Sequence, residues 1–157
     1  GSLPRADFKA GQIPAGPTGA AGPAGPAGAA GAAGPPGPSD AYARAVSGPI
    51  TLPVPFTTIA NLPIPQAGRY VVWAKTGARS TNTTGQLTCI LVEVAGNLQI
   101  DQAATLVTPS WWSGLALQAS REFASAGSVD LRCSGGGSIQ VLDIRMAAVR
   151  VANLTTT

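Results

Sequence analysis

From about residue 40 onward, apolar and polar residues tend to alternate along the chain. The clearest case is residues 69–75 (RYVVWAK), where Tyr70, Val72 and Ala74 share one face. A period of two is typical of a β-strand that packs one face on a core. About eight such segments, separated by turn-rich stretches, predict an all-β domain with the architecture of an antiparallel jelly roll or β-sandwich.

One expected strand is apolar on both faces. In residues 86–94 (QLTCILVEV), Leu87, Cys89 and Leu91 lie on one side, and the other side is also largely apolar. The core of one sandwich covers only one face of a strand. Packing three copies of the domain around an axis would bury the remaining apolar surface.

The C-terminal part of the chain predicts a hairpin. Residues 134–137 (SGGG) are typical of a turn, and they join an expected strand at residues 129–133 to a final strand at residues 138–151. We expect these two strands to pair. A change of phase at Ala147-Ala148 predicts a β-bulge in the final strand.

Residues 16–39 follow a different rule, because every third residue is glycine. The glycines of this repeat are Gly16, Gly19, Gly22, Gly25, Gly28, Gly31, Gly34 and Gly37. A strict Gly-x-y period with proline at other positions is typical of the collagen triple helix, in which only glycine fits at the axis. A flexible linker is the alternative, but it has no reason to keep glycine in phase. The repeat therefore predicts a homotrimer, with residues 1–15 as a lead-in linker.

The expected rod is short and weakly reinforced. At a rise of about 3 Å per residue, its length is on the order of 70 Å. It contains no charged residue, and three of its triplets are Gly-Ala-Ala. We therefore expect the β domain, residues 40–157, to be the trimerisation domain, since linking the rod to it raises the local concentration of the three chains.

Composition argues against several classes of function. The chain has no histidine, only 11% charged residues and a formal net charge of +3. Without histidine it lacks the usual general base and the commonest metal ligand, so we expect no enzyme, no metal site and no cofactor. Its lysines and arginines form no run, which argues against nucleic-acid binding. No apolar stretch approaches the ~20 residues that span a bilayer, so we expect no membrane insertion of this fragment.

Asp130 and Asp143 form a candidate pair for chemistry. They lie on the two strands expected to pair through the SGGG turn, and neighbouring carboxylates can bind calcium or act on glycosides. Arg132 and Arg145 each lie two residues from one of them, on the same faces. Cross-strand ion pairs on a solvated face are the simpler interpretation.

The chain has two cysteines, Cys89 and Cys133. In a chain whose other features are typical of an extracellular protein, an even number of cysteines predicts a disulfide. Two buried free thiols, packed as small apolar side chains, are the alternative.

Trp111 and Trp112 are the candidate ligand or trimer contacts. Adjacent residues on a strand point to opposite faces, so one position in the core and one at a subunit interface would explain the pair. The alternative is an exposed tryptophan that stacks on a sugar ring or anchors a protein partner.

The chain as a whole resembles known collagen-like proteins. A Gly-x-y rod followed by one all-β domain is similar to the complement and tumour-necrosis-factor-like trimers. The segments ADFKAGQIPAGPTG, AGRYVVWAK, QLTCILVEV, SVDLRC and IRMAAVRV resemble bacterial collagen-like surface proteins, a family common in actinobacteria. The resemblance implies that the β domain nucleates and holds the trimer. In eukaryotic relatives, such domains also bind protein or carbohydrate partners.

We therefore expect a structural, collagen-like homotrimer that is secreted or displayed on the cell surface. Its main partner would be itself, with a protein or carbohydrate ligand as an additional possibility. The alternative hypothesis is a receptor- or glycan-binding tip of a phage fibre or a spore-surface filament.

Overall fold

The computed structural model describes residues 9, 11, 16–29, 31 and 40–152. The chain divides into two units, residues 1–34 and residues 35–157, and each is described by itself. Most of the expected lead-in lies outside the described residues. So does the end of the glycine repeat, with Gly34 and Gly37.

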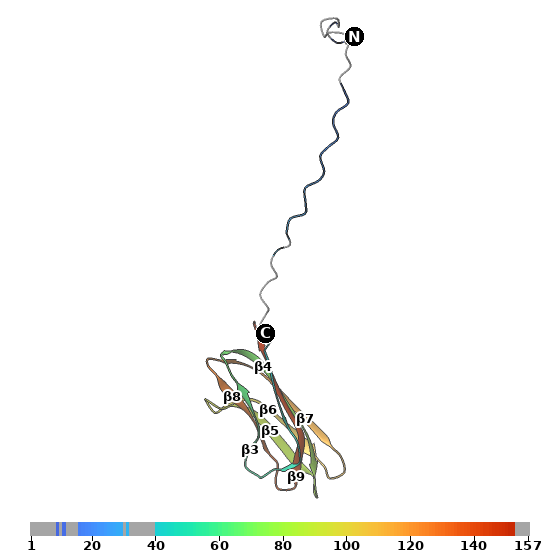
Figure 1. The fold of residues 1–157 in the computed structure, drawn as a ribbon. Helices are drawn as coiled ribbons and strands as arrows, with labels where there is room; N and C mark the ends of the chain where they lie inside the picture. The colour runs from blue at the N-terminus through green and yellow to red at the C-terminus, as the bar shows by residue number, and fades with distance from the viewer. Residues whose placement is uncertain (1–8, 10, 12–15, 30, 32–39, 153–157) are drawn as a thin grey trace. The chain divides into compact units, whose positions relative to one another are not determined.

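In residues 16–29 the chain is exposed and forms neither helix nor strand. Figure 1 draws this stretch as an extended blue trace. A Cβ atom added to any described glycine of the repeat would meet no atom within 4 Å; these are Gly16, Gly19, Gly22, Gly25, Gly28 and Gly31. A single chain therefore gives no steric reason for glycine at these positions.

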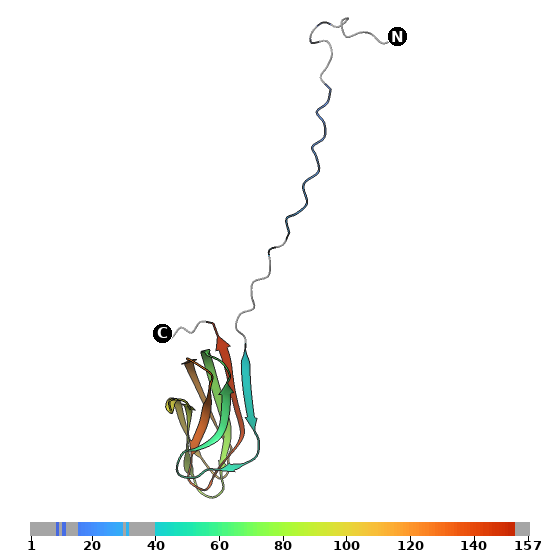
Figure 2. The same cartoon turned by 60° about the vertical axis from the view of Figure 1, so that its left-hand side comes forward.

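The β domain contains two antiparallel sheets that pack face to face (Figure 1). The first, here called the β4 sheet, contains β1 (Ala41–Val46), β9 (Ile139–Val151), β4 (Gly68–Ser80) and β7 (Ser113–Phe123) in that order, with the short β2 (Ile50–Thr51) also paired to β9. The second, the β5 sheet, contains β3 (Thr57–Ile64), β8 (Gly127–Ser134), β5 (Gly85–Glu93) and β6 (Leu98–Val107) in that order. Figure 2 shows β1 lying beside β9 at one edge.

The order of the strands makes this sandwich a jelly roll. Among the described strands, β5 and β6 are the one consecutive pair that is hydrogen-bonded to each other, and most other connections cross between the sheets. The predicted all-β, antiparallel jelly roll is therefore confirmed. No helix long and apolar enough to cross a membrane occurs in the described part of the chain.

The predicted hairpin at residues 134–137 is wrong. The turn carries the chain from β8 in the β5 sheet to β9 in the β4 sheet, so the two strands do not pair. The glycines allow the chain to reverse, but they do not decide which sheet it enters. Leu52 and Ile139 pack against Gly135, where a Cβ atom would lie 3.1 to 3.3 Å from their side chains.

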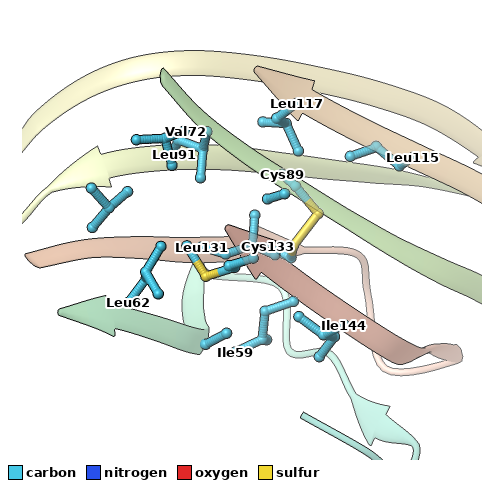
Figure 3. Packing of buried hydrophobic residues seen from close by; sticks show 14 of the residues in the cluster. Ile59, Leu62, Val72, Cys89, Leu91, Leu115, Leu117, Leu131, Cys133 and Ile144 are labelled. Atoms are coloured by element: carbon cyan, nitrogen blue, oxygen red, sulfur yellow. A yellow bond between two sulfur atoms is a disulfide. The ribbon is translucent and has the colours of Figure 1, made fainter. Parts of the chain in front are cut away.

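The core lies between the two sheets. Tyr70, Val72 and Ala74 are buried, as the alternation in residues 69–75 predicts. Figure 3 shows Val72 and Leu117, from the β4 sheet, together with Leu91 and other buried side chains of the β5 sheet. The core is continuous through the sandwich, which makes residues 40–152 one packed body.

A disulfide joins Cys89 of β5 to Cys133 of β8 (Figure 3). The two cysteines lie directly opposite each other on neighbouring strands, and both are fully buried. The predicted disulfide is confirmed, and the alternative of two free thiols is wrong. The bond links strands within one sheet, so packing rather than the disulfide holds the two sheets together.

A β-bulge occurs in β9, earlier than predicted. Between the pairs Lys75–Arg145 and Gly77–Leu142, β9 contains one extra residue, Asp143. Asp143 has a φ of 51°, in the left-handed region that aspartate tolerates better than most residues. The prediction at Ala147-Ala148 was wrong because apolar residues occupy both faces of this part of β9. The sequence alone therefore does not show which of these residues point toward the core.

Polar contacts also join the β5 sheet to the β4 sheet, two of them at the side chains of Asp101 and Glu93. Asp101 of β6 accepts a hydrogen bond from the backbone N–H of Gln118 on β7, at 2.8 Å. Glu93 of β5 forms an ion pair with Arg121 of β7, at 2.6 Å. The first contact occupies a backbone donor at the edge of the β4 sheet, where an unpaired strand edge would otherwise invite association.

Candidate interaction face

The outer side of the β4 sheet, which points away from the core, carries an apolar patch with charged side chains around it, among them Arg69, Lys75 and Arg145. Four neighbouring strands contribute small or apolar side chains to it. We call this surface the apolar face: Ala41, Ala43, Ala45, Val71, Trp73, Ala116, Ala147 and Val149. A sheet face that is left to water is normally polar, so this composition indicates a surface that is covered by something.

Trp73 lies at the centre of the apolar face and is 38% exposed. In the strand register, Ala147 lies beside it on one side and Gln118 on the other, and Ala43 lies beyond Ala147. Because the alanines are small, the large indole stands beside open space. A hollow of about 610 Å³ opens here.

Two cations, Lys75 and Arg145, lie on the outer side of the sheet at this hollow. We call them the basic cluster. Arg44 also borders the hollow, but it pairs with Met146 and therefore points to the core side of the sheet. Lys75 and Arg145 lie directly opposite each other on neighbouring strands. No aspartate or glutamate lines this hollow, and Asp143 lines the adjoining one together with Lys75. The ion pairs within the described residues involve other arginines, namely Arg69, Arg121, Arg132 and Arg150.

Asp130 and Asp143 do not form the carboxylate pair that the sequence suggested, because β8 and β9 belong to different sheets. Asp130 accepts hydrogen bonds from Thr58, Asn61 and Arg132 on the outer side of the β5 sheet. The Asp130–Arg132 ion pair, at 3.0 Å, lies within one strand rather than across two. Among the described residues, no group of three or more histidines, cysteines, aspartates or glutamates is arranged to hold a metal.

Trp111 and Trp112 lie in the loop between β6 and β7, just before β7 begins at Ser113. They are 77% and 56% exposed, so a place in the core of the protomer is wrong for both. The alternation that predicted opposite faces applies to strands, and these residues precede the strand. The guanidinium of Arg79 lies 5.2 Å from the centre of the Trp112 ring, within cation–π range. Both residues stay candidate ligand or trimer contacts.

The sequence did not identify the apolar face or the basic cluster. Residues 86–94 were expected to supply the surplus apolar surface; on the outer side of β5, Val92 is buried within the protomer and Ile90 is partly buried. One usable signal was in residues 41–45 (AYARA), where alanine takes every second position on a strand. Only the pairing of β1, β9, β4 and β7 shows that these alanines continue the surface around Trp73.

No protein-family model and no curated protein matches this sequence. A chain in the structure of infectious bursal disease virus, Gx strain, matches with a TM-score of 0.54 and 8% identity, over 74% of this chain and 33% of the viral chain. Eiger TNF from S. frugiperda matches with a TM-score of 0.47 and 11% identity, over 76% of this chain and 96% of that chain. A Bacillus endospore appendage protein matches with a TM-score of 0.43 and 10% identity, over 73% of this chain and 91% of the appendage chain.

These comparisons concern the fold of the β domain. The viral match supports the jelly-roll assignment made from the strand order. The present chain spans about a third of the viral chain's length. At identities this low, the match carries no information about ligands or activity.

Proposed function

We propose that this protein is a structural homotrimer of the collagen-like kind. Residues 16–39 of three chains would form a short triple helix, and the jelly-roll domains would bring the three chains together and hold them. The observation that carries the proposal is the coexistence, in one chain, of an unbroken Gly-x-y repeat and a β domain with an unpartnered apolar face.

The glycine repeat supports three chains rather than one. In the single chain, the described glycines of the repeat have open space where a Cβ atom would be. Strict glycine at every third residue has a physical explanation only when other chains crowd that position, as they do at the axis of a triple helix.

The apolar face supports contact between the β domains. Its alanines and valines would allow close approach of a second copy, and Trp73 offers a large apolar side chain for burial at such a contact. A closed ring of three copies, each using this face once, would supply the three chains that a triple helix needs. A closed ring also cannot grow into a filament.

The disulfide and the kind of repeat support a role outside the cytoplasm, either secreted or on a cell surface. We propose a mechanical and scaffolding role rather than an enzymatic one. The resemblance of the sequence to bacterial, actinobacterial-type collagen-like surface proteins is what suggests this role.

Replacing one alanine on each sheet by arginine tests the role of the apolar face. Ala43→Arg places a charge on the apolar face, whereas Ala104→Arg places the same charge at an exposed strand position of the β5 sheet. Burying an unpaired charge at a contact is costly, so we expect Ala43→Arg to weaken trimer association at least about tenfold. Ala104→Arg should leave the association unchanged. Equal behaviour of the two variants, measured by light scattering over a dilution series, would contradict the proposal.

A second candidate function is ligand binding at the tip of a fibre or spore-surface filament. The exposure of Trp111, 77%, favours it, since a large exposed indole is a common anchor for sugars and proteins. Glycan-array binding by the full chain that disappears in Trp111→Ala, but not in Thr83→Ala on a nearby polar loop, would support this function. An array without any bound glycan would leave no support for a glycan ligand.

A further inference from the structure

We propose that one end of the β domain binds peripherally to the surface of an electrically neutral lipid bilayer. The contact would be made by the exposed apolar side chains of Val54, Phe56, Trp111 and Trp112. None of them belongs to the apolar face, which the proposed trimer covers. The inference goes beyond the proposed function and does not depend on it, since one protomer carries all four residues. A peripheral contact needs no membrane-spanning segment.

Four connections between strands lie at this end of the sandwich, which we call the loop end: residues 52–56, 81–84, 108–112 and 135–138. The first and last strands meet at the opposite end of the domain, where the backbone N–H of Arg150 donates to the carbonyl oxygen of Asp40 at 2.9 Å. Figure 2 shows the start of β1, in cyan, beside the end of β9, in red, at that opposite end. The loop end is therefore the part of the domain farthest along the strands from Asp40.

Large exposed apolar side chains gather at the loop end. Among the described residues, eight large apolar side chains are exposed, and four of them lie in these connections. Val54 is 74% exposed and precedes β3, at one edge of the β5 sheet, whereas Trp111 follows β6, at the other edge. Apolar side chains at two opposite corners fit a flat, extended surface better than a small ligand held at one point.

Hydrogen bonds and proline rings hold these connections in place. The hydroxyl of Ser134 donates to the carbonyl oxygen of Val54. The backbone N–H of Ser80 donates to the carbonyl oxygen of Thr108 at 3.3 Å. Proline fixes one backbone dihedral, and three prolines lie in the connections that carry the exposed side chains: Pro53, Pro55 and Pro109. The side chains are thus presented to solvent with little further ordering needed, which lowers the entropic cost of a contact.

The absence of charge at the loop end indicates the kind of surface that it fits. None of the four connections contains a charged residue. Arg79, at the end of β4, already stacks on Trp112 and donates to the side-chain oxygen of Gln140 at 3.3 Å. Contact with an apolar surface therefore desolvates no charge in these connections, and no run of cations favours anionic lipids. Tryptophan is favoured at the level of the lipid headgroups, where its ring is buried and its N–H stays hydrated.

Flotation of the full chain with phosphatidylcholine vesicles tests the proposal. We expect the protein to float with the vesicles. Its partition coefficient should change less than about twofold when phosphatidylserine is added to the vesicles or when the salt concentration is raised, because apolar burial is not screened. Soluble phosphocholine should not compete, since the contact is with the bilayer surface rather than with one headgroup.

Substitutions at the two corners locate the contact. Val54→Ser and Trp111→Ser should each lower the partition coefficient at least about threefold, because each removes apolar surface that the bilayer would bury. Val94→Ser/Leu98→Ser is the matched control: both residues are exposed, but they flank the turn between β5 and β6 at the opposite end. It should change the partition coefficient less than about twofold. Circular dichroism and light scattering check that each variant keeps its fold and its mass.

Each outcome bears on the proposal. Weaker flotation of both corner variants, with an unchanged control, supports a bilayer contact at the loop end. Loss in Trp111→Ser alone would indicate a single anchor for a glycan or a protein and would overturn the proposal. So would an equal loss in the control, flotation that requires phosphatidylserine, or no flotation of the parent protein. The trimer mass is measured separately, so failure here leaves the proposed function untouched.

Discussion

Tyr70 places a phenol inside the core of the β domain. Its ring meets Phe123 edge-on, with centroids 5.7 Å apart, and its hydroxyl donates to the backbone carbonyl oxygen of Gln66 at 3.2 Å. Burial raises the pKa of Tyr70 above its ordinary value, and the neighbouring Tyr42 raises it further. The neutral phenol is therefore the form that the folded domain accommodates.

This shift predicts a loss of stability in alkali. The folded domain holds the Tyr70 proton more tightly than the unfolded chain, whose tyrosines have a pKa of about 10. The stabilisation is complete below that pH and is lost as the pH rises through the folded-state value. Thermal unfolding followed from about pH 8 to about pH 11 should therefore show a shallower decline in Tyr70→Phe than in the parent protein. Equal slopes for the two proteins would mean that Tyr70 does not cause the decline.

The Cys89–Cys133 disulfide closes a separation of 44 residues within one sheet. For a loop of that length, the chain-entropy model gives about 4 kcal/mol of stabilisation, near the upper end of the usual range. We expect Cys89→Ala/Cys133→Ala to lower the free energy of unfolding by about 2–4 kcal/mol. Urea denaturation measures this loss. A thiol assay on the denatured, non-reduced protein should find no free thiol, and two thiols per chain would contradict the bond.

At the scale of elements, the bulge in β9 is fixed by Asp143. Its φ of 51° is tolerated by glycine, asparagine and aspartate but is strained for a β-branched residue. Thr76 contributes to the same irregularity by donating a hydrogen bond to the carbonyl oxygen of Leu142, at 3.0 Å. The bulge changes which residues of β9 point outward and thereby places Arg145 and Ala147 on the apolar face.

Substitutions at Asp143 test this role. Asp143→Val should destabilise the domain by about 1–3 kcal/mol, because valine is strained at positive φ. Asp143→Gly removes the same carboxylate without that strain and should be neutral or slightly stabilising. Chemical denaturation of both variants distinguishes backbone strain from loss of charge, since charge loss would affect both alike.

In the proposed triple helix of residues 16–39, the need for glycine at every third position can be tested by single substitutions. Gly25→Ala puts a methyl group where a triple helix has no room and should lower the melting temperature of the rod, while the β domain stays folded. Ala24→Ser changes the neighbouring residue without touching the glycine phase and should have a much smaller effect. Circular dichroism follows the collagen-type signal and the β signal separately. A rod signal that melts identically in both variants would contradict the triple helix.

The sequence predicted the elements better than their arrangement. Alternation located Tyr70, Val72 and Ala74 as the inward residues of β4, because the charged Arg69 and Lys75 at the two ends of the segment share the other face. It misplaced the bulge in β9, where alanine and valine occupy both faces. It also paired β8 with β9, because a glycine-rich turn fits a hairpin and a crossing between sheets equally well.

The candidate surfaces were harder to predict than the fold. Trp111 and Trp112 were conspicuous by residue type, but their exposure depends on the point at which β7 begins. Lys75 and Arg145 are far apart in the sequence and meet only through the register of β4 and β9. Nothing in the one-dimensional pattern separates such a cluster from scattered surface charge.

At the scale of the whole molecule, we propose different roles for the two units in one trimeric assembly. In the proposed trimer, the repeat would need three chains, and we expect it to be too short and too poorly reinforced to gather them alone. The β domain is a packed body with its own core, and its apolar face offers a contact area for neighbouring copies. Association through this face would raise the local concentration of the repeats and lower the cost of starting the triple helix.

The central claim is the trimer, and the solution mass of the full chain tests it most directly. Light scattering coupled to size-exclusion chromatography, over a range of protein concentrations, gives this mass independently of shape. Our account predicts three times the mass of one chain, 15.6 kDa, with no stable dimer on dilution. A monomer at all concentrations, or a dimer, would contradict it, because neither can form a triple helix.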